Sequence, residues 1–231
     1  MNRLTSIATG IGLLLITASG ASAATYTFCA GVGCSTENAT VTITQVGSIT
    51  EITATNNLPN PTDVVQAISQ IYLNFSAAPT AATFDSTQPN QNIVTVNGGG
   101  TFTTGTDPNE WLVSTSSNTV LLDSLVAGPD QTILGPPGGA TYANANGSIA
   151  GNGPHNPFIN QTGVFFLDIT DRGSLTSVVL NFGTVAGGDP ITGVLTPLPG
   201  GLPLFGVVSL GLMGLLGWRR GRNGRALGAV A

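Results

Sequence analysis

The sequence predicts an all-β protein whose body, residues 24–196, is an antiparallel β-sandwich or jelly roll. The body is rich in Thr, Gly, Asn, Ser, Val and Ile and poor in the helix formers Lys, Glu and Arg, a composition that favours strands joined by turns. Short apolar runs recur along it, many of them bounded by Gly, Pro, Asn or Asp, as in sandwiches and barrels. A chain of about 170 residues suits one domain, and no linker divides it.

The first predicted strands are Val41–Thr44 and Ile49–Thr53, joined around Gly47-Ser48. Beyond them, Pro61 precedes a segment in which helical and strand spacing compete. The apolar residues Val64, Ile68, Ile71, Tyr72 and Phe75 fall at helical spacing, whereas Ile71, Leu73 and Phe75 alternate. We therefore expect a helical turn over 63–68, capped by Thr62 or Asp63, that leads into a strand over 70–76.

Five later runs are also predicted to be strands: Ile93–Val96, Trp111–Val113, Thr119–Val126, Val164–Ile169 and Leu175–Phe182. Between them, residues 128–158 are dense in Gly, Pro and Asn. This composition predicts a long surface loop, and loops of such length inside a domain are often functional.

The N-terminus has the pattern of a secretory signal peptide over residues 1–23. Arg3 supplies a positive charge, residues 7–16 form a short apolar segment, and Ala21-Ser22-Ala23 fits the small-x-small rule for cleavage before Ala24. We expect the body to be exported. The alternative is an ordinary buried N-terminal helix.

The C-terminus predicts one transmembrane helix over about 201–218, followed by an Arg-rich tail over 219–231. The run from Leu202 to Trp218 carries no charge and is close to the shortest length that spans a bilayer. An interfacial Trp followed by arginines predicts that the C-terminus lies in the cytoplasm and the body outside. The anchor residues are Leu202, Trp218, Arg219, Arg220 and Arg222. A buried core helix and a permanent single-pass anchor are the alternatives.

The body is acidic and contains no lysine. Arg172 is its one arginine against eleven Asp and Glu, a formal charge of −10. Nucleic-acid binding requires clustered Lys or Arg and is therefore excluded. The absence of lysine also excludes P-loop NTPases and Schiff-base enzymes.

Cys29 and Cys34 follow the predicted cleavage position closely, and we expect them to form a disulfide in an oxidising compartment. Zinc would need more soft ligands than these cysteines and His155 provide. A redox-active pair is the other alternative, but the spacing is C-x4-C rather than C-x-x-C.

Candidate chemistry is sparse, and we predict no enzymatic activity, no cofactor and no metal. His155 has three interpretations: a catalytic base, a metal or ligand contact, or a turn residue that hydrogen-bonds its own loop. The carboxylates of 107–110 and 168–171 do not match an EF-hand, so calcium remains a minor alternative. A glycan-binding or hydrolytic module that uses the 128–158 loop is a further alternative. The aromatic residues available to it are few and more often belong to a core: Tyr26, Tyr72, Trp111 and Tyr142.

Pro197-Leu198-Pro199-Gly200, the apolar run and Arg219-Arg220 together resemble the C-terminal sorting signal of PEP-CTERM proteins, in the variant whose motif is Val-Pro-Leu-Pro-Ala. Thr196 stands in place of the motif's Val and Gly200 in place of its Ala, and the chain continues to Ala231. The resemblance implies cleavage near residues 197–200 by an exosortase, a membrane transpeptidase of Gram-negative bacteria, and transfer of the body to a surface acceptor such as exopolysaccharide. The leading hypothesis is an exported cell-surface or matrix protein whose body is periplasmic or extracellular.

Overall fold

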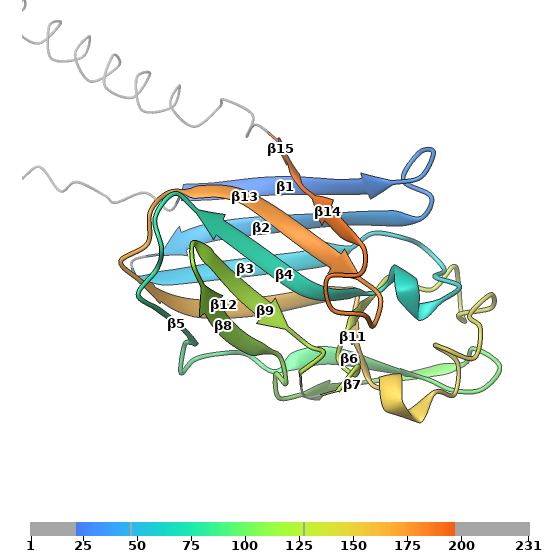
Figure 1. Ribbon diagram of the computed structural model, residues 1–231. Coiled ribbons are helices and arrows are strands. Elements are labelled where there is room, and N and C mark those ends of the chain that lie inside the picture. Colours follow the sequence, from blue (N-terminus) through green and yellow to red (C-terminus); the bar gives the residue numbers. More distant parts are fainter. Residues whose placement is uncertain (1–21, 47, 127, 197–231) are drawn as a thin grey trace, which may run out of the picture.

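The computed structural model describes residues 22–46, 48–126 and 128–196, which form two β-sheets packed face to face (Figure 1). The body is all-β and sandwich-like, as predicted. Most of the predicted signal peptide, the turn residue Gly47 and everything from Pro197 onward lie outside the described residues.

The first sheet has six strands in the order β15-β1-β2-β3-β12-β5, and every pair in it is antiparallel. Its centre, β2 and β3, is the predicted hairpin. The strands are β1 (Ser22–Ala30), β2 (Glu37–Val46), β3 (Ile49–Asn56), β5 (Ala81–Phe84), β12 (Thr162–Thr170) and β15 (Val194–Thr196).

The second sheet follows the order β14-β13-β4-β10-β11-β6-β7, and β9 joins β4 to β8 beside it. The pair β10–β11 is parallel and the other pairs are antiparallel. The strands are β4 (Ile68–Phe75), β6 (Gln91–Val96), β7 (Phe102–Asp107), β8 (Leu112–Ser116), β9 (Thr119–Asp123), β10 (Ile133–Leu134), β11 (Phe158–Asn160), β13 (Leu175–Phe182) and β14 (Pro190–Thr192).

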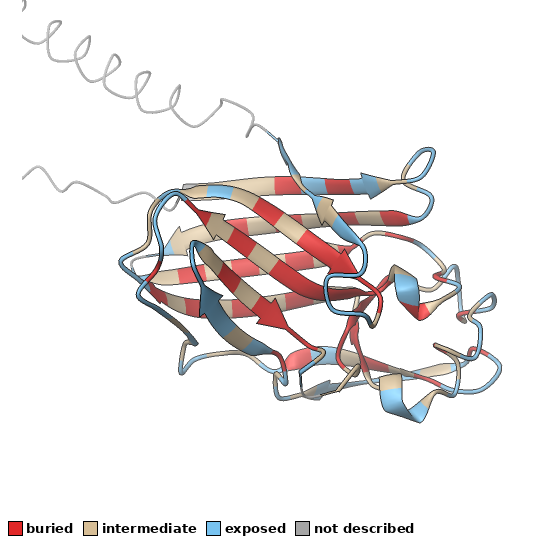
Figure 2. Ribbon diagram, viewed as in Figure 1, coloured by how far each residue is buried: buried red, intermediate tan, exposed pale blue. Residues whose placement is uncertain are grey.

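The main core lies between the two sheets, where alternate residues of the long strands β2, β3 and β12 are buried (Figure 2). Trp111 and Phe165 meet there with ring centroids 4.9 Å apart, and both side chains are fully buried. We call this cluster the sandwich core: Tyr26, Phe28, Ala39, Val41, Ile43, Ile52, Ala54, Ile68, Ile71, Leu73, Phe75, Trp111, Val120, Leu122, Ile133, Ile159, Phe165, Leu167, Ile169, Val178, Leu180 and Phe182.

A second, smaller cluster lies beside the first, under the segment between β10 and β11. Tyr142 packs edge-on against Phe102 with ring centroids 5.5 Å apart. Its hydroxyl donates to the carbonyl of Gly135 at 3.1 Å, and burial raises its pKa to about 12. We call this cluster the loop core: Val64, Ala67, Val94, Val96, Leu134, Tyr142, Ile149 and Phe158.

The prediction of a surface loop over 128–158 is therefore wrong in part. Ile133, Leu134 and Phe158 belong to strands, and Tyr142 and Ile149 are 1 % and 0 % exposed. One side of the segment is buried because its isolated apolar side chains pack against those of β6. Its Gly- and Asn-rich stretches are nevertheless largely on the surface.

The competing helix and strand patterns after Pro61 both occur, as predicted. A single 3-10 turn, η1 (Val64–Gln66), is capped by Asp63, whose side chain accepts from the Val65 N–H at 3.1 Å. Gln66 closes the cap by accepting from the backbone N–H of Asp63 at 3.4 Å. β4 begins directly afterwards, so the turn serves to direct the chain into the sandwich core.

Side-chain amides cover the part of β12 that β5 does not reach. Gln88 accepts from Phe166 N–H at 2.7 Å and donates to the carbonyl of Val164 at 2.8 Å. Gln91 exchanges the same two kinds of bond with Val164. These amides satisfy backbone groups that a sheet edge would otherwise expose.

Candidate functional site

The feature that bears most directly on function is the position of β15, the last strand of the described residues. β15 pairs with β1 in the register Thr25↔Thr196, Tyr26↔Leu195 and Thr27↔Val194. Thr196 immediately precedes the predicted sorting motif, and Thr25 follows the predicted cleavage position by one residue. The predicted signal peptide and the predicted C-terminal anchor are thus attached to neighbouring strands at one edge of the first sheet.

Between β14 and β15 the chain passes from the second sheet to the first. β14 pairs with β13 in the second sheet, and β15 pairs with β1 in the first. Gly193 lies between them, where a Cβ would stand 2.5 Å from the Phe28 ring. The crossing therefore requires a glycine, and it connects β15 in the first sheet directly to β14 in the second.

β1 begins two residues before the predicted cleavage position. Ser22 pairs with Gln45 and Ala23 with Thr44, so cleavage before Ala24 removes two pairs from the end of the β1–β2 ladder. Seven pairs remain, from Ala24↔Ile43 to Ala30↔Glu37. The mature N-terminus would then lie on β1, beside the edge strand β15.

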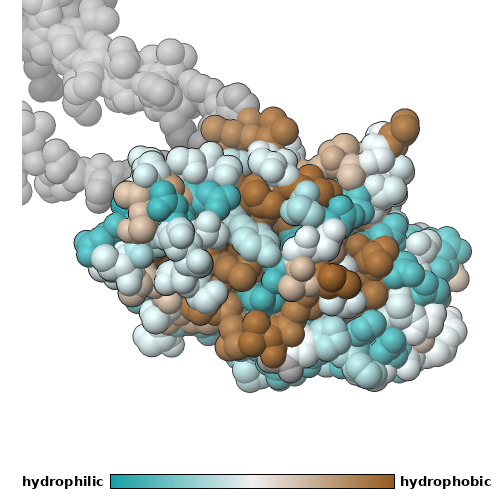
Figure 3. Space-filling view, in the orientation of Figure 1, coloured by the Kyte–Doolittle hydropathy of each residue, from teal (hydrophilic) through white to brown (hydrophobic). Residues whose placement is uncertain are grey.

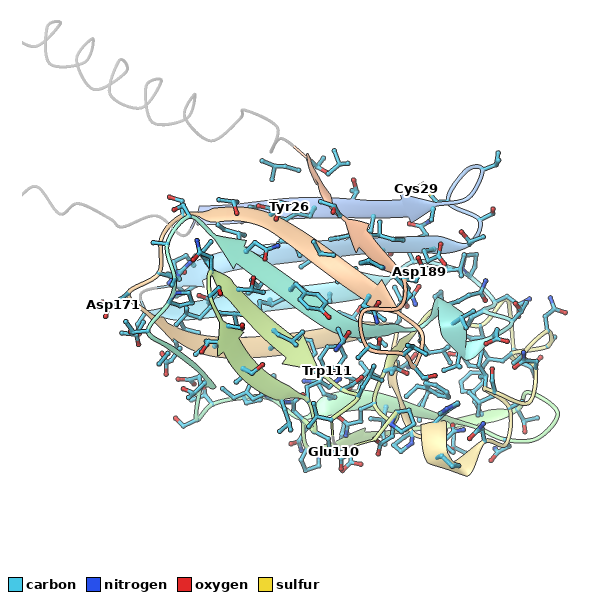
Figure 4. The ribbon with its side chains drawn as sticks, viewed as in Figure 1. Tyr26, Cys29, Glu110, Trp111, Asp171 and Asp189 are labelled. Atoms are coloured by element: carbon cyan, nitrogen blue, oxygen red, sulfur yellow. A yellow bond between two sulfur atoms is a disulfide. The ribbon has the colours of Figure 1, made fainter. Side chains whose placement is uncertain are left out.

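The predicted disulfide is confirmed. Cys29, near the end of β1, is bonded to Cys34, in the turn that joins β1 to β2, with Cα atoms 4.7 Å apart. Figure 4 places Cys29 toward one end of the sandwich and Asp171 at the other. The turn carries Val32, which is 96 % exposed.

His155 is bound to its own loop, which confirms the turn interpretation. Its Nδ1 lies 2.6 Å from the Ser148 carbonyl, and because a carbonyl only accepts, Nδ1 must carry the proton. The Ser148 hydroxyl also contacts Asp63 Oδ1 at 3.2 Å, while Asn146 Nδ2 donates to Asp63 Oδ2 at 2.6 Å. These bonds join the predicted loop to the cap of η1.

The charge environment of Asp63 follows from this network. The hydrogen bond from Val65 N–H, followed by those from Asn146 and Ser148 and the charge of His155, holds the pKa of Asp63 below its usual value. His155, Ser148 and Asp63 thus form a hydrogen-bonded cluster, the Asp63 cluster, that joins η1 to the loop.

The two carboxylate groups singled out in the sequence lie in different settings. Burial, followed by the neighbouring Asp130 and Asp107, raises the pKa of Glu110. Asp168 lies in β12 opposite Thr83, and Asp171 accepts from the Thr80 hydroxyl at 3.1 Å. Within residues 22–46, 48–126 and 128–196, no three His, Cys, Asp or Glu side chains are placed to hold a metal ion.

Three of the four aromatic residues considered for ligand stacking belong to the cores. Tyr26, Trp111 and Tyr142 are at most 6 % exposed, while Tyr72 is half-buried and donates to Gln70 at 2.8 Å. Trp111 is held by a bond from its indole N–H to the Gln131 carbonyl at 2.8 Å. These rings stabilise the fold rather than offer a stacking surface.

The sorting motif Pro197–Gly200, the helix over 201–218 and the anchor arginines lie outside the described residues. Within the described ranges, no helix is long and apolar enough to cross a membrane. Comparisons with protein-family models, with curated proteins and with solved structures found no match.

Proposed function

We propose that this chain is an exported cell-surface or matrix protein of a Gram-negative bacterium, whose body is held at the membrane by the C-terminal helix until an exosortase-type enzyme cuts near residues 197–200. The signal peptide over 1–23, the membrane helix and the jelly-roll-like character of the sandwich are parts of this proposal. The body is a cargo without a catalytic role. An exopolysaccharide or another surface component is the proposed acceptor.

The observation that carries the proposal is the pairing of Thr25 with Thr196. A signal peptide and a C-terminal anchor must both approach the same membrane during export. In this fold they do so from adjacent strands at one sheet edge, so neither has to wrap around the body. Thr196, the last residue of β15, immediately precedes the proline-containing motif in the sequence.

The chemistry of the body supports an extracytoplasmic location. The Cys29–Cys34 disulfide suits an oxidising compartment. The formal charge of −10 keeps the body away from anionic surfaces. Arg172, the one arginine of the body, lies over the Phe75 ring at 5.7 Å.

Replacing the motif prolines tests the sorting step in the native cell. The Pro197→Ala/Pro199→Ala double variant should accumulate in the membrane fraction with its C-terminal helix attached, while the wild-type body reaches the surface. Pro190→Ala, in exposed β14, is the control and should behave as wild type. Equal surface delivery of the double variant would overturn the role of the motif. A wild-type protein that stays in the membrane at full mature length would indicate a permanent anchor.

A further inference from the structure

A cavity of about 460 Å³ lies on the part of the second sheet formed by β11, β6 and β7. This size is within the range of small-ligand sites. The strands lie beside the loop core, at the end of the body shown at the lower right of Figure 1, where the surface in view is mostly hydrophilic to neutral (Figure 3). The lining residues are Asn92, Ile93, Thr104, Gly105, Thr106 and Asn160, none of them charged.

Strand alternation places the four polar side chains on the same face of the sheet. Asn92 is opposite Thr106, and the register Phe158↔Val94 and Ile159↔Ile93 continues to bring Asn160 beside Asn92. Thr104 lies opposite Val94, one step along the same face. The result is an array of two amides and two hydroxyls that crosses three neighbouring strands.

These side chains are available to a ligand. Asn92, Thr104 and Thr106 are exposed and Asn160 is half-buried. In the described part of the chain, none of the four forms a side-chain hydrogen bond to the protein, unlike the bonded amides of Asn56, Asn156 and Asn181. Farther along the same face, Val94, Val96 and Phe158 are buried in the loop core, so the polar array begins where the covered surface ends.

We propose that this polar array is a binding site for a neutral saccharide chain. Amide and hydroxyl groups both donate and accept hydrogen bonds, as sugar hydroxyls do, and a row of them can follow a chain of linked sugars. The body's charge of −10 disfavours acidic polymers. A peptide strand that paired with β7, the edge strand of this sheet, would instead require apolar side-chain pockets, whereas the side chains of this array are polar. This binding is independent of how the C-terminus is processed.

The test uses the full-length chain in detergent and a panel of neutral glucans, mannans and galactans, with alginate and hyaluronate as acidic counterparts. Thr104→Val and Thr106→Val remove one hydroxyl each while keeping a β-branched residue. Thr103→Val is the matched control, because Thr103 is exposed on the same strand but points to the opposite face. Thermal unfolding checks that all variants are folded.

We expect binding to at least one neutral polymer, weakened about three- to tenfold by Thr104→Val and more by the double variant, as the loss of hydrogen bonds predicts. Thr103→Val should bind as wild type. The proposal is overturned if no neutral polymer binds, if only the acidic polymers bind, or if Thr103→Val weakens binding as much as Thr104→Val does.

Discussion

The sandwich core and the loop core are both fully buried, but they are built in different ways. In the sandwich core, long strands place alternate apolar residues between two sheets, as in β2, where Ala39, Val41 and Ile43 point inward. In the loop core, alternate residues of β6, Val94 and Val96, pack with isolated apolar residues such as Tyr142, which hydrogen bonds hold in place. One core depends on a repeated pattern, whereas the other also depends on specific polar contacts.

The loop core shows how specific these contacts are. Tyr142 N–H donates to the carbonyl of Gly100 at 2.9 Å. Gly100 has a φ of 80°, and a Cβ there would lie 2.4 Å from the Tyr142 carbonyl oxygen. The close approach of the two segments therefore requires glycine, and no periodic pattern in the sequence records that requirement.

The largest expected effects come from removing the central aromatic side chain of each core, Trp111 in the sandwich core and Tyr142 in the loop core. Trp111→Ala should destabilise the body by about 3–5 kcal/mol, because it opens a cavity between the sheets and leaves the Gln131 carbonyl unpaired. Urea unfolding measures this change. In native-state hydrogen exchange, Tyr142→Ala should instead increase exchange mainly at the amides of 135–158.

Equal loss of protection in both sheets after Tyr142→Ala would contradict the distinction between the cores. In that case they would form a single cooperative unit. Tyr142→Phe is the milder control, because it keeps the ring beside Phe102 and removes only the hydroxyl bond to Gly135.

Asn56 connects the two cores, and its replacement should have the next largest effect. Its amide donates to the carbonyls of Gln66 and Ile133 at 2.8 and 3.0 Å, and its Oδ1 accepts from Leu58 N–H at 3.1 Å. Asn56→Ala should cost about 3 kcal/mol, since three bonds of about 1 kcal/mol each are lost in a buried site. Chemical denaturation measures it. Asn57→Ala is the control and should have little effect, because the Asn57 amide makes one long bond, to Thr40 at 3.4 Å.

The disulfide lies outside both cores, so its removal should affect stability less. Cys29→Ser/Cys34→Ser should lower the free energy of unfolding by about 2 kcal/mol, the chain-entropy value for so short a loop. Thermal unfolding of the variant and of reduced wild type should agree. A loss comparable to that of Trp111→Ala would show that the β1–β2 turn is part of the sandwich core's cooperative unit.

The smallest expected effect is a pH dependence of the folding stability that arises from the Asp63 cluster. The pKa of Asp63 is below its usual value of 3.8, so its ionised form stabilises the folded state. This contribution is present above that usual value and is lost as the pH falls through the lowered pKa. Asp63→Asn should therefore destabilise the body at pH 6 and have a smaller effect at pH 2, as measured by urea unfolding at each pH.

Glu110→Gln provides the contrasting control, because the pKa of Glu110 is raised. Protonation favours the folded state there, and this contribution is lost as the pH rises through the raised pKa. The variant should be slightly more stable than wild type at neutral pH. A gain in stability of Asp63→Asn at pH 6, the sign expected for Glu110→Gln, would show that the hydrogen bonds to Asp63 are not stabilising.

The contrast between the cores also explains what the sequence could predict. Alternation of Val or Ile with Thr predicted β2 and β3, and short apolar runs bounded by turn residues predicted β12 and β13. β7 escaped because half of its residues are Thr, all exposed, with little alternation. β15 was missed because three residues carry no periodic signal. The disulfide followed from the cysteine count and the expected compartment.

The candidate sites were only partly predictable. The turn interpretation of His155 rested on the Gly, Pro and Asn around it, and it is confirmed by the bond to Ser148. The polar array on β11, β6 and β7 could not be identified, because it depends on which strands are neighbours: Asn92 and Asn160 are distant in sequence and adjacent only through the β6–β11 register. Isolated Tyr142 and Ile149 in a turn-rich segment were the one available sign of the loop core.

The pairing of β15 with β1 brings the last described strand beside the first, so the proposed processing would act next to the N-terminal strand of the body. Mass spectrometry of the C-terminus of the surface-exposed population, isolated from the native cell, tests the proposed processing most directly. We predict an end between Pro197 and Gly200 that carries the acceptor or its remnant. Intact Ala231 on the surface protein would contradict the account.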